Sequence, residues 1–128
     1  MKTLKFLTSC TFLSVLLFSA QGLTFPSMLS AESTNTMTFT EATNYCRNLS
    51  APCDLAVDGS ACGADTLKGW YLPSADELGR FVGLSSSESY LWTRSQYSEY
   101  DKYIALSLLD GSWGWAEYGA AVGARCAQ

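Results

Sequence analysis

Aromatic and acidic side chains gather around a predicted hairpin in the last third of the chain. Flat rings stack against sugar faces and also anchor protein interfaces, because they bring a large contact area at low entropic cost. Neighbouring carboxylates can accept hydrogen bonds from hydroxyl groups. This pattern predicts a site for a carbohydrate or a protein surface. Its candidate ligand-binding residues are Tyr97, Tyr100, Asp101, Trp113, Trp115 and Glu117.

The same rings also suit a hydrophobic core. Trp113 and Trp115 share one face of a regular strand, as residues that fill an interior do. Tyr97 and Tyr100 belong to the polar stretch "SQYSEYDK", which favours exposure for them. The sequence leaves both interpretations of the tryptophans open.

No histidine occurs in the 128 residues. This excludes histidine-based zinc and iron sites, serine–histidine dyads and cysteine–histidine proteases. A glycosidase needs only two carboxyl groups about 5 to 9.5 Å apart, so it stays as a remote alternative. With 12 acidic residues, however, many such pairs arise by accident. We therefore expect a non-enzymatic protein with no catalytic residues and no cofactor.

Three aspartates, Asp54, Asp58 and Asp65, lie in one loop and could collect a hard cation with loop carbonyls. Their spacing matches no EF-hand loop, and a solvated loop is the simpler interpretation. We predict no metal site.

The first residues read as an export signal. Lys2 and Lys5 form a short basic region, and an apolar run continues to Phe18. We predict a signal peptide over residues 1–31, with cleavage after Gly22 or, slightly favoured, after Ala31. The apolar run is too short to span a bilayer, so we expect no membrane insertion after cleavage. The mature protein is expected to be secreted or periplasmic.

Removal of residues 1–31 takes away two of the eight basic residues and no acidic ones, so the net charge becomes −6. This charge argues against nucleic acid as a partner. Four cysteines remain, at positions 46, 53, 62 and 126, and they predict two disulfides in a short exported chain. Four cysteines allow three pairings, among which Cys53–Cys62 is the natural local bridge.

The segment from Leu23 to Met37 is rich in Ser and Thr and shows little periodicity, so we predict that residues 32–37 form a flexible leader. The domain is expected over residues 38–128. A helix is predicted in "FTEATNYCRNLS", capped by Thr40, with one inward face. That face consists of Ala42, Tyr45, Cys46 and Leu49.

The stretch "GWYLPSADELGRF" predicts a short buried strand and then a second helix. Ser74 and Glu77 form a capping box, and Leu78, Phe81 and Val82 supply an inward stripe. Every residue of this stretch is explained by its structural role, so we interpret it as framework rather than as an active site.

Short strands follow. One is predicted from Ser89, and a hairpin is predicted to turn at Asp110-Gly111, with Ile104 and Leu106 on one face. A last strand in "AVGARCA" would bring Cys126 to the first helix. Two helices followed by antiparallel strands predict an α+β domain.

These segments resemble, in order, a known family. The stretches "TFTEATNYCRNL", "GWYLPSADEL" and "LWTRS", a hairpin with "DGS" and the closing "GARCAQ" resemble the bacterial Lcl C-terminal-like domain family. The third block departs from the more usual "YWSS". The resemblance covers residues 38–128 and implies a compact C-type-lectin-like fold, in which two helices pack on short antiparallel strands. It also implies a Cys46–Cys126 disulfide.

The resemblance does not carry an activity with it. "LPSADEL" is similar to a segment of the formylglycine-generating enzymes, but their late cysteine pair is absent, since only Cys126 lies beyond Cys62. The E-P-N and W-N-D signatures of calcium-dependent lectins are absent as well. We expect a recognition module for a carbohydrate or a surface protein, such as an adhesion domain. A structural or assembly subunit of an envelope or surface complex is the alternative.

Overall fold

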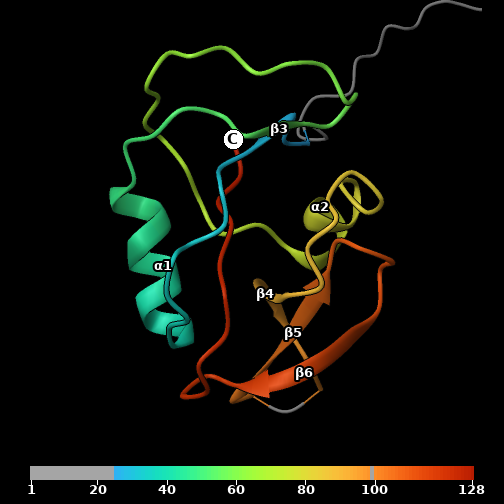
Figure 1. Ribbon diagram of the computed structural model, residues 1–128. Helices are drawn as coiled ribbons and strands as arrows, with labels where there is room; N and C mark the ends of the chain where they lie inside the picture. Colours follow the sequence, from blue (N-terminus) through green and yellow to red (C-terminus); the bar gives the residue numbers. More distant parts are fainter. Residues whose placement is uncertain (1–24, 99) are drawn as a thin grey trace, which may run out of the picture.

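Two helices and two antiparallel sheets make up the computed structural model, which describes residues 25–98 and 100–128 (Figure 1). The predicted cleavage position at Gly22 lies outside these residues. The small sheet pairs β2 with β3, and the larger one has the order β4-β5-β6. This is the α+β class predicted from the sequence. The elements are β2 (Met28–Leu29), α1 (Phe39–Asn48), β3 (Leu55–Ala56), α2 (Ala75–Gly79), β4 (Tyr90–Gln96), β5 (Lys102–Ser107) and β6 (Trp113–Glu117).

Helix α1 is capped by Thr38 and not, as predicted, by Thr40. The Thr38 hydroxyl accepts from the Glu41 amide at 3.3 Å, and the Thr38 amide donates to the Glu41 carboxylate at 2.9 Å. This reciprocal box needs a glutamate three residues after the cap, which only Thr38 has. Ala42 and Cys46 are fully buried, as predicted.

Helix α2 has the predicted capping box. The Ser74 amide donates to the Glu77 carboxylate at 2.8 Å, and the Glu77 amide donates to the Ser74 hydroxyl at 3.1 Å. Leu78 and Phe81 are fully buried. The strand predicted before this helix is reduced to one bridge, between Tyr71 and Ala127. The stretch is framework in this structure too.

Glu77 should make stability depend on pH. Burial opposes its ionisation, but the backbone hydrogen bond from Ser74 and the Arg94 guanidinium at 2.7 Å outweigh burial, so the Glu77 pKa lies below its ordinary value of 4.5. The resulting stabilisation is complete above the unfolded-state pKa and is lost as the pH falls through the folded-state pKa. We therefore expect the free energy of unfolding to drop below about pH 4.5.

Urea unfolding between about pH 6 and pH 3 tests this expectation. Glu77→Gln should lower stability near neutral pH and flatten the acid limb, because the glutamine does not titrate. The exposed Glu88 offers a control, and Glu88→Gln should keep the wild-type slope. Equal slopes for all three proteins would contradict the assignment.

The three-stranded sheet is a meander that buries both faces of its central strand only in the second half of that strand. Strand β5 lies between β4 and β6, so Ala105, Leu106 and Ser107 are all buried. Ile104 and Leu106 share one face as predicted, but the opposite face is buried too at Ala105 and Ser107, and Ile104 is only half-buried. The predicted turn is present: the Ser112 amide donates to the Asp110 carboxylate at 2.9 Å, and Gly111 has φ +80°. That positive φ suits glycine.

A bulge interrupts β4, and other segments of the chain cover this edge of the sheet. The register shifts between Trp92 and Gln96, and the Thr93 hydroxyl donates to the Ile104 carbonyl at 2.8 Å. The Trp92 and Arg94 amides turn away from β5 and donate to the carbonyls of Gly123 and Pro73, at 2.9 and 2.8 Å. The β4 edge is therefore covered by other segments of the chain.

Residues 121–128 pass through the middle of the molecule, between α1 and the β4-β5-β6 sheet (Figure 1). They form isolated bridges instead of the predicted strand, because their neighbours change along their length. Met37 pairs with Val122, Leu91 with Gly123, and both Leu29 and Tyr71 with Ala127. Cys126 thereby reaches α1.

The flexible leader predicted at residues 32–37 is instead part of the fold. Ser33 donates its amide to the Ala124 carbonyl at 2.8 Å, and Met37 exchanges two backbone hydrogen bonds with Val122. The preceding Leu29 is fully buried. Backbone hydrogen bonds do not depend on side-chain type, so the Ser/Thr-rich composition gave no sign of them.

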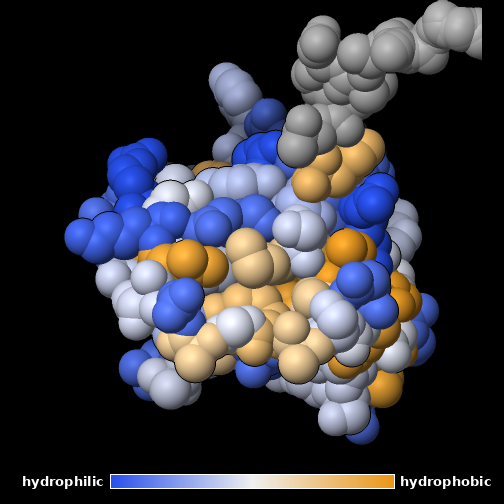
Figure 2. Space-filling model, turned by 90° about the horizontal axis from the view of Figure 1, so that it is seen from above, coloured by the Kyte–Doolittle hydropathy of each residue, from blue (hydrophilic) through white to orange (hydrophobic). Residues whose placement is uncertain are grey.

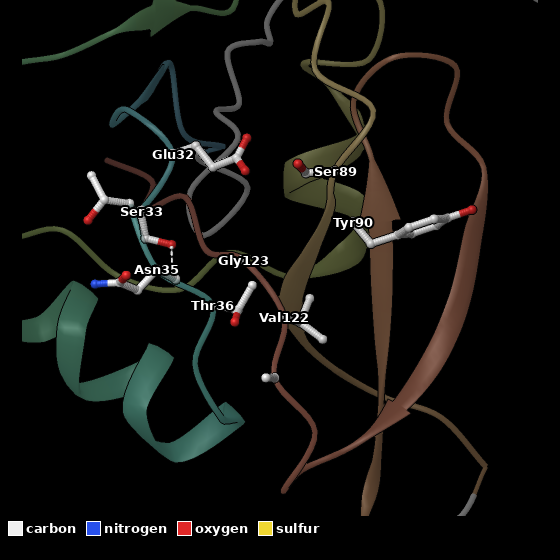
Figure 3. Close-up of a pocket in the computed structure, with 10 residues that line it drawn as sticks. Glu32, Ser33, Asn35, Thr36, Ser89, Tyr90, Val122 and Gly123 are labelled. Atoms are coloured by element: carbon white, nitrogen blue, oxygen red, sulfur yellow. Dashed lines mark hydrogen bonds between the residues drawn. The ribbon is translucent and has the colours of Figure 1, made fainter.

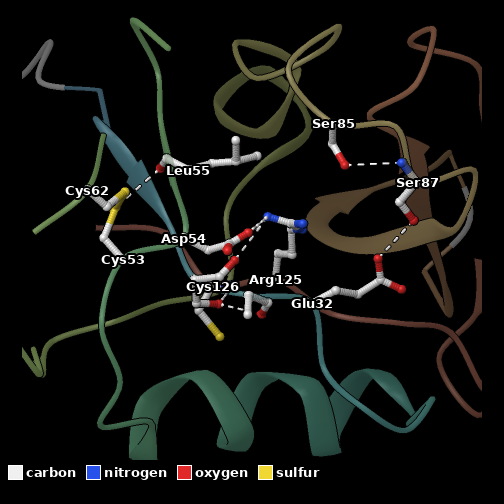
Figure 4. Close-up of polar contacts among 11 residues, drawn as sticks. Glu32, Cys53, Asp54, Leu55, Cys62, Ser85, Ser87, Arg125 and Cys126 are labelled. Atoms are coloured by element: carbon white, nitrogen blue, oxygen red, sulfur yellow. Dashed lines mark hydrogen bonds and ion pairs between the residues drawn. A yellow bond between two sulfur atoms is a disulfide. The ribbon is translucent and has the colours of Figure 1, made fainter. Parts of the chain in front are cut away.

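Both disulfides expected from the sequence are formed, Cys46–Cys126 and Cys53–Cys62. Next to the second bridge, the Asp54 carboxylate pairs with the Arg125 guanidinium at 3.1 Å (Figure 4). Arg125 is only 7% exposed and also donates to the Ser30 carbonyl. This contact ties the loop of residues 50–66 to the centre of the molecule.

Figure 2 views the end of the molecule that carries this loop, where moderately hydrophobic atoms lie among hydrophilic ones. In the part of the chain that the structure describes, neither helix is long and apolar enough to cross a membrane.

Candidate functional site

One face of the β4-β5-β6 sheet is covered at one end only. At that end Leu91 and Leu106 pack against Leu78 and Phe81 of the α2 region. Along the edge strand β6, alternate residues project from the same face as Leu106, because side chains alternate along a strand. Trp113 and Trp115 lie there, 56% and 49% exposed. The interior role considered for these tryptophans is therefore wrong.

Tyr97 completes this surface from the β4–β5 connection. Its amide donates to the Lys102 carbonyl at 2.8 Å, which places it opposite Lys102 at the end of the ladder. Its ring centroid lies 6.2 Å from that of Trp113 and 6.3 Å from that of Trp115. We call Tyr97, Trp113 and Trp115 the aromatic face.

Charged groups border the aromatic face. The Lys102 ammonium lies 4.3 Å from the centroid of the Trp115 ring, a cation–π contact. Lys102 is also the cross-strand partner of Glu117, which is exposed. Glu117 was predicted from the sequence, whereas Lys102 was missed. Counting residues outward from Asp110-Gly111 would not have paired the two, because the ladder is centred one residue earlier, between Leu109 and Asp110.

A hollow of about 820 Å³ adjoins the aromatic face at Tyr97. It contains the other two predicted residues, Tyr100 and Asp101, and Tyr100 is 85% exposed. The Asp101 carbonyl accepts from the Tyr118 amide at 2.8 Å, which holds the rim of the hollow to the end of β6. All six predicted residues therefore lie in one region, with Tyr97 as the link between its two parts.

Tyr103 belongs to the core rather than to this surface. It projects from the opposite face of β5 and stacks on Phe39, with ring centroids 3.8 Å apart and planes 10° apart. Phe39 in turn contacts Trp92 edge-on at 5.8 Å. Strand alternation thus separates a core ring from the exposed rings.

A second cavity, of about 320 Å³, lies between residues 32–36, Ser89–Tyr90 and 121–123 (Figure 3). The Ser33 hydroxyl donates to the Asn35 carbonyl and accepts from the Ala124 amide. The Glu32 carboxylate accepts from Ser87. These polar groups hold the segment of residues 32–36 in place, so we assign the cavity a structural role.

The carboxylates with displaced pKa values do not suit acid catalysis. A hydrogen bond from the Ser60 side chain holds the pKa of Asp58 below its ordinary value, and the Ser112 amide does the same for Asp110. The pKa of Glu77 is lowered as well. A glycosidase acid needs the opposite shift.

The predicted loop aspartates do not form a cation site. Asp54 pairs with Arg125, and Asp58 accepts from the Ser60 amide. Across residues 25–98 and 100–128, no three His, Cys, Asp or Glu side chains gather in a way that could hold a metal ion.

No protein-family model, curated protein or solved structure matches this chain. A function can therefore be inferred only from the site itself, and the aromatic face is its best-defined part.

Proposed function

We propose that the protein is an exported, non-enzymatic recognition module that binds carbohydrate through the aromatic face. One observation carries the proposal. The ring centroid of Tyr97 lies 6.2 and 6.3 Å from the ring centroids of two tryptophans that are about half exposed. Placing two half-exposed tryptophans beside the half-buried Tyr97 leaves apolar area in water, which is unfavourable unless a ligand covers it. Exposed ring area gathered in this way suits the flat faces of sugar rings.

The polar surroundings favour a sugar over a purely apolar ligand. Glu117 and Asp101 can accept from sugar hydroxyls, and Lys102 can donate to them. The hollow continues the surface from Tyr97 to Tyr100, so a ligand longer than one sugar ring has further side chains to contact.

The proposal also includes a cellular compartment and a fold family. Two disulfides support an oxidising compartment, which is the secreted or periplasmic location inferred from the sequence. The family resemblance supports a C-type-lectin-like fold, in which the Cys46–Cys126 bridge joins the first helix to the last segment.

Loss of single rings should weaken binding strongly. Central aromatic residues of an interface contribute about 2 kcal/mol or more, so Trp115→Ala or Tyr97→Ala should raise the Kd about 30-fold. A glycan array first selects the sugar, and calorimetric titration of the hit gives the Kd of each variant. Tyr90→Ala is the matched control, because Tyr90 is 47% exposed and is not part of the aromatic face. No bound glycan on folded protein, or equal losses in all three variants, would contradict the proposal.

A second candidate is an assembly subunit of an envelope or surface complex. It is favoured by the exposed apolar surface around the hairpin, which extends beyond the aromatic face to Leu109 and Tyr118, 42% and 54% exposed. A negative glycan array and capture of a defined envelope protein would favour it. Turnover of a chromogenic glycoside, abolished by one carboxylate substitution, would instead revive the glycosidase.

A further inference from the structure

The two edges of the β4-β5-β6 sheet differ in whether other segments of the chain bond to them. The β4 edge is covered, since the Trp92 and Arg94 amides donate to Gly123 and Pro73. At the β6 edge, no described residue forms a bridge or a strand pair with Trp113–Glu117 other than β5. β6 also has no proline and no lysine, the residues that commonly protect open edges. The open edge is therefore available to another strand.

The ladder shows which backbone groups this edge offers. Tyr118 donates to the Asp101 carbonyl, and Ser107 donates to the Ser112 carbonyl, so the even-numbered residues of β6 bond to β5. Bonding alternates along an antiparallel pair. The N–H and C=O groups of Trp113, Trp115 and Glu117 therefore point outward. Only the Glu117 carbonyl has a backbone partner among the described residues, the Ala120 amide.

We propose that β6 pairs antiparallel with β6 of a second copy of this chain, which makes a continuous six-stranded sheet. A two-fold axis at Trp115 fits the outward groups: Trp115 bonds to its own counterpart, and Trp113 bonds to Glu117 of the other copy. Isologous pairing of this kind uses the same patch twice. A β-edge partner gains its affinity from main-chain hydrogen bonds, which this register offers at three positions in each copy. The Glu117 carbonyl would accept from both the Ala120 amide of its own chain and the Trp113 amide of the other copy.

The side chains of β6 are compatible with this register. On the exposed face the two Trp115 rings lie directly opposite, and an aromatic cross-strand pair is favourable. Each Glu117 lies opposite a Trp113 rather than another acid, and its own cross-strand neighbour is Lys102. On the reverse face the pairs are Gly114 with Ala116, which are too small to clash. No like charges meet across the proposed seam, although the whole chain is acidic.

The proposal does not depend on the proposed glycan function, because the main-chain groups of β6 carry it and the Trp115 pair only adds to it. Pairing at the edge leaves both aromatic faces on the same side of one sheet. The dimer would present two aromatic faces side by side. Dimerisation is measured without any glycan, so each proposal can fail alone.

Sedimentation equilibrium of the oxidised protein, up to about 100 μM, gives the first test. We expect a monomer–dimer equilibrium. Glu117→Pro should raise the dimer Kd about 30-fold, because it removes two symmetry-related hydrogen bonds at the seam. The proline spares the fold, since the Glu117 amide makes no bond to β5 and the residue before it is already extended. Glu117→Ala keeps the amide and should leave the Kd within about twofold.

Cross-linking tests the register. Trp115→Cys places a thiol at the two-fold axis, where paired Cα atoms lie about 5.5 Å apart, within disulfide range. Mild oxidation should give a covalent dimer. Trp113→Cys is the matched control, because its counterpart is displaced about 13 Å along the strand and should not cross-link. A monomer at every concentration, equal Kd values for the two Glu117 variants, or equal cross-linking of the two cysteines would overturn the proposal.

Discussion

Replacing Cys46 and Cys126 together with alanine should lower the free energy of unfolding by about 4.5 kcal/mol. The bridge closes a separation of 80 residues, and loop-closure entropy sets the size of the effect. The whole free energy of unfolding of a single domain is only about 5 to 15 kcal/mol. Both cysteines are fully buried between α1 and residues 121–128, so the variant also loses packing there. Urea unfolding followed by circular dichroism measures the change.

The second disulfide provides the internal comparison. Cys53 and Cys62 are nine residues apart, and the same entropy relation gives about 2.5 kcal/mol for their bridge. Cys53→Ala with Cys62→Ala should therefore leave a folded protein that unfolds at lower urea. If the two double variants lost equal stability, loop length would not determine how much each bridge stabilises the fold.

A chain that begins at Glu32 should fail to fold stably, whereas one that begins at Leu23 should fold. Starting at Glu32 removes Leu29, which is fully buried in the core beneath α2. Loss of a buried leucine side chain alone costs about 2 to 5 kcal/mol. It also removes Ser30, whose amide donates to the Cys126 carbonyl at 2.8 Å and whose hydroxyl accepts from the Cys126 amide at 2.9 Å. The total is comparable with the whole stability of the domain.

Thermal unfolding measures the stability of the two chains. Leu29→Ala in the longer chain should have a stability between theirs. If the protein is exported with the signal peptide proposed from its sequence, the same reasoning favours cleavage after Gly22, because cleavage after Ala31 would discard these contacts. Intact mass of the exported form should then give Leu23 as its first residue. A stable, cooperatively folded chain from Glu32 would show that the segment before it is dispensable.

Local signals predicted the framework well. The capping box at Ser74 and the turn at Asp110-Gly111 depend on residues close together in sequence, so their chemistry could be recognised directly. The inward positions of Ala42 and Cys46 followed from helical periodicity. Composition and position also selected the aromatic residues that the structure brings together around the hairpin.

Long-range backbone contacts could not be predicted in the same way. Nothing in the Ser/Thr-rich types of residues 32–37 shows that Ser33 and Met37 bond to Ala124 and Val122, about 90 residues away. The exposure of Trp113 and Trp115 was equally hidden, because it depends on how much of the sheet the short helix α2 covers. Alternation shows that two side chains share a face but not which face is buried.

The path of residues 121–128 has a consequence for the order of events during biosynthesis. The Met28 amide donates to the Gln128 carbonyl, so this hydrogen bond cannot form until about a hundred further residues have been synthesised. α1 likewise lacks its neighbour Cys126 until that segment emerges from the ribosome. The early part of the nascent chain therefore cannot close its core alone and completes its packing only after residues 121–128 have been made.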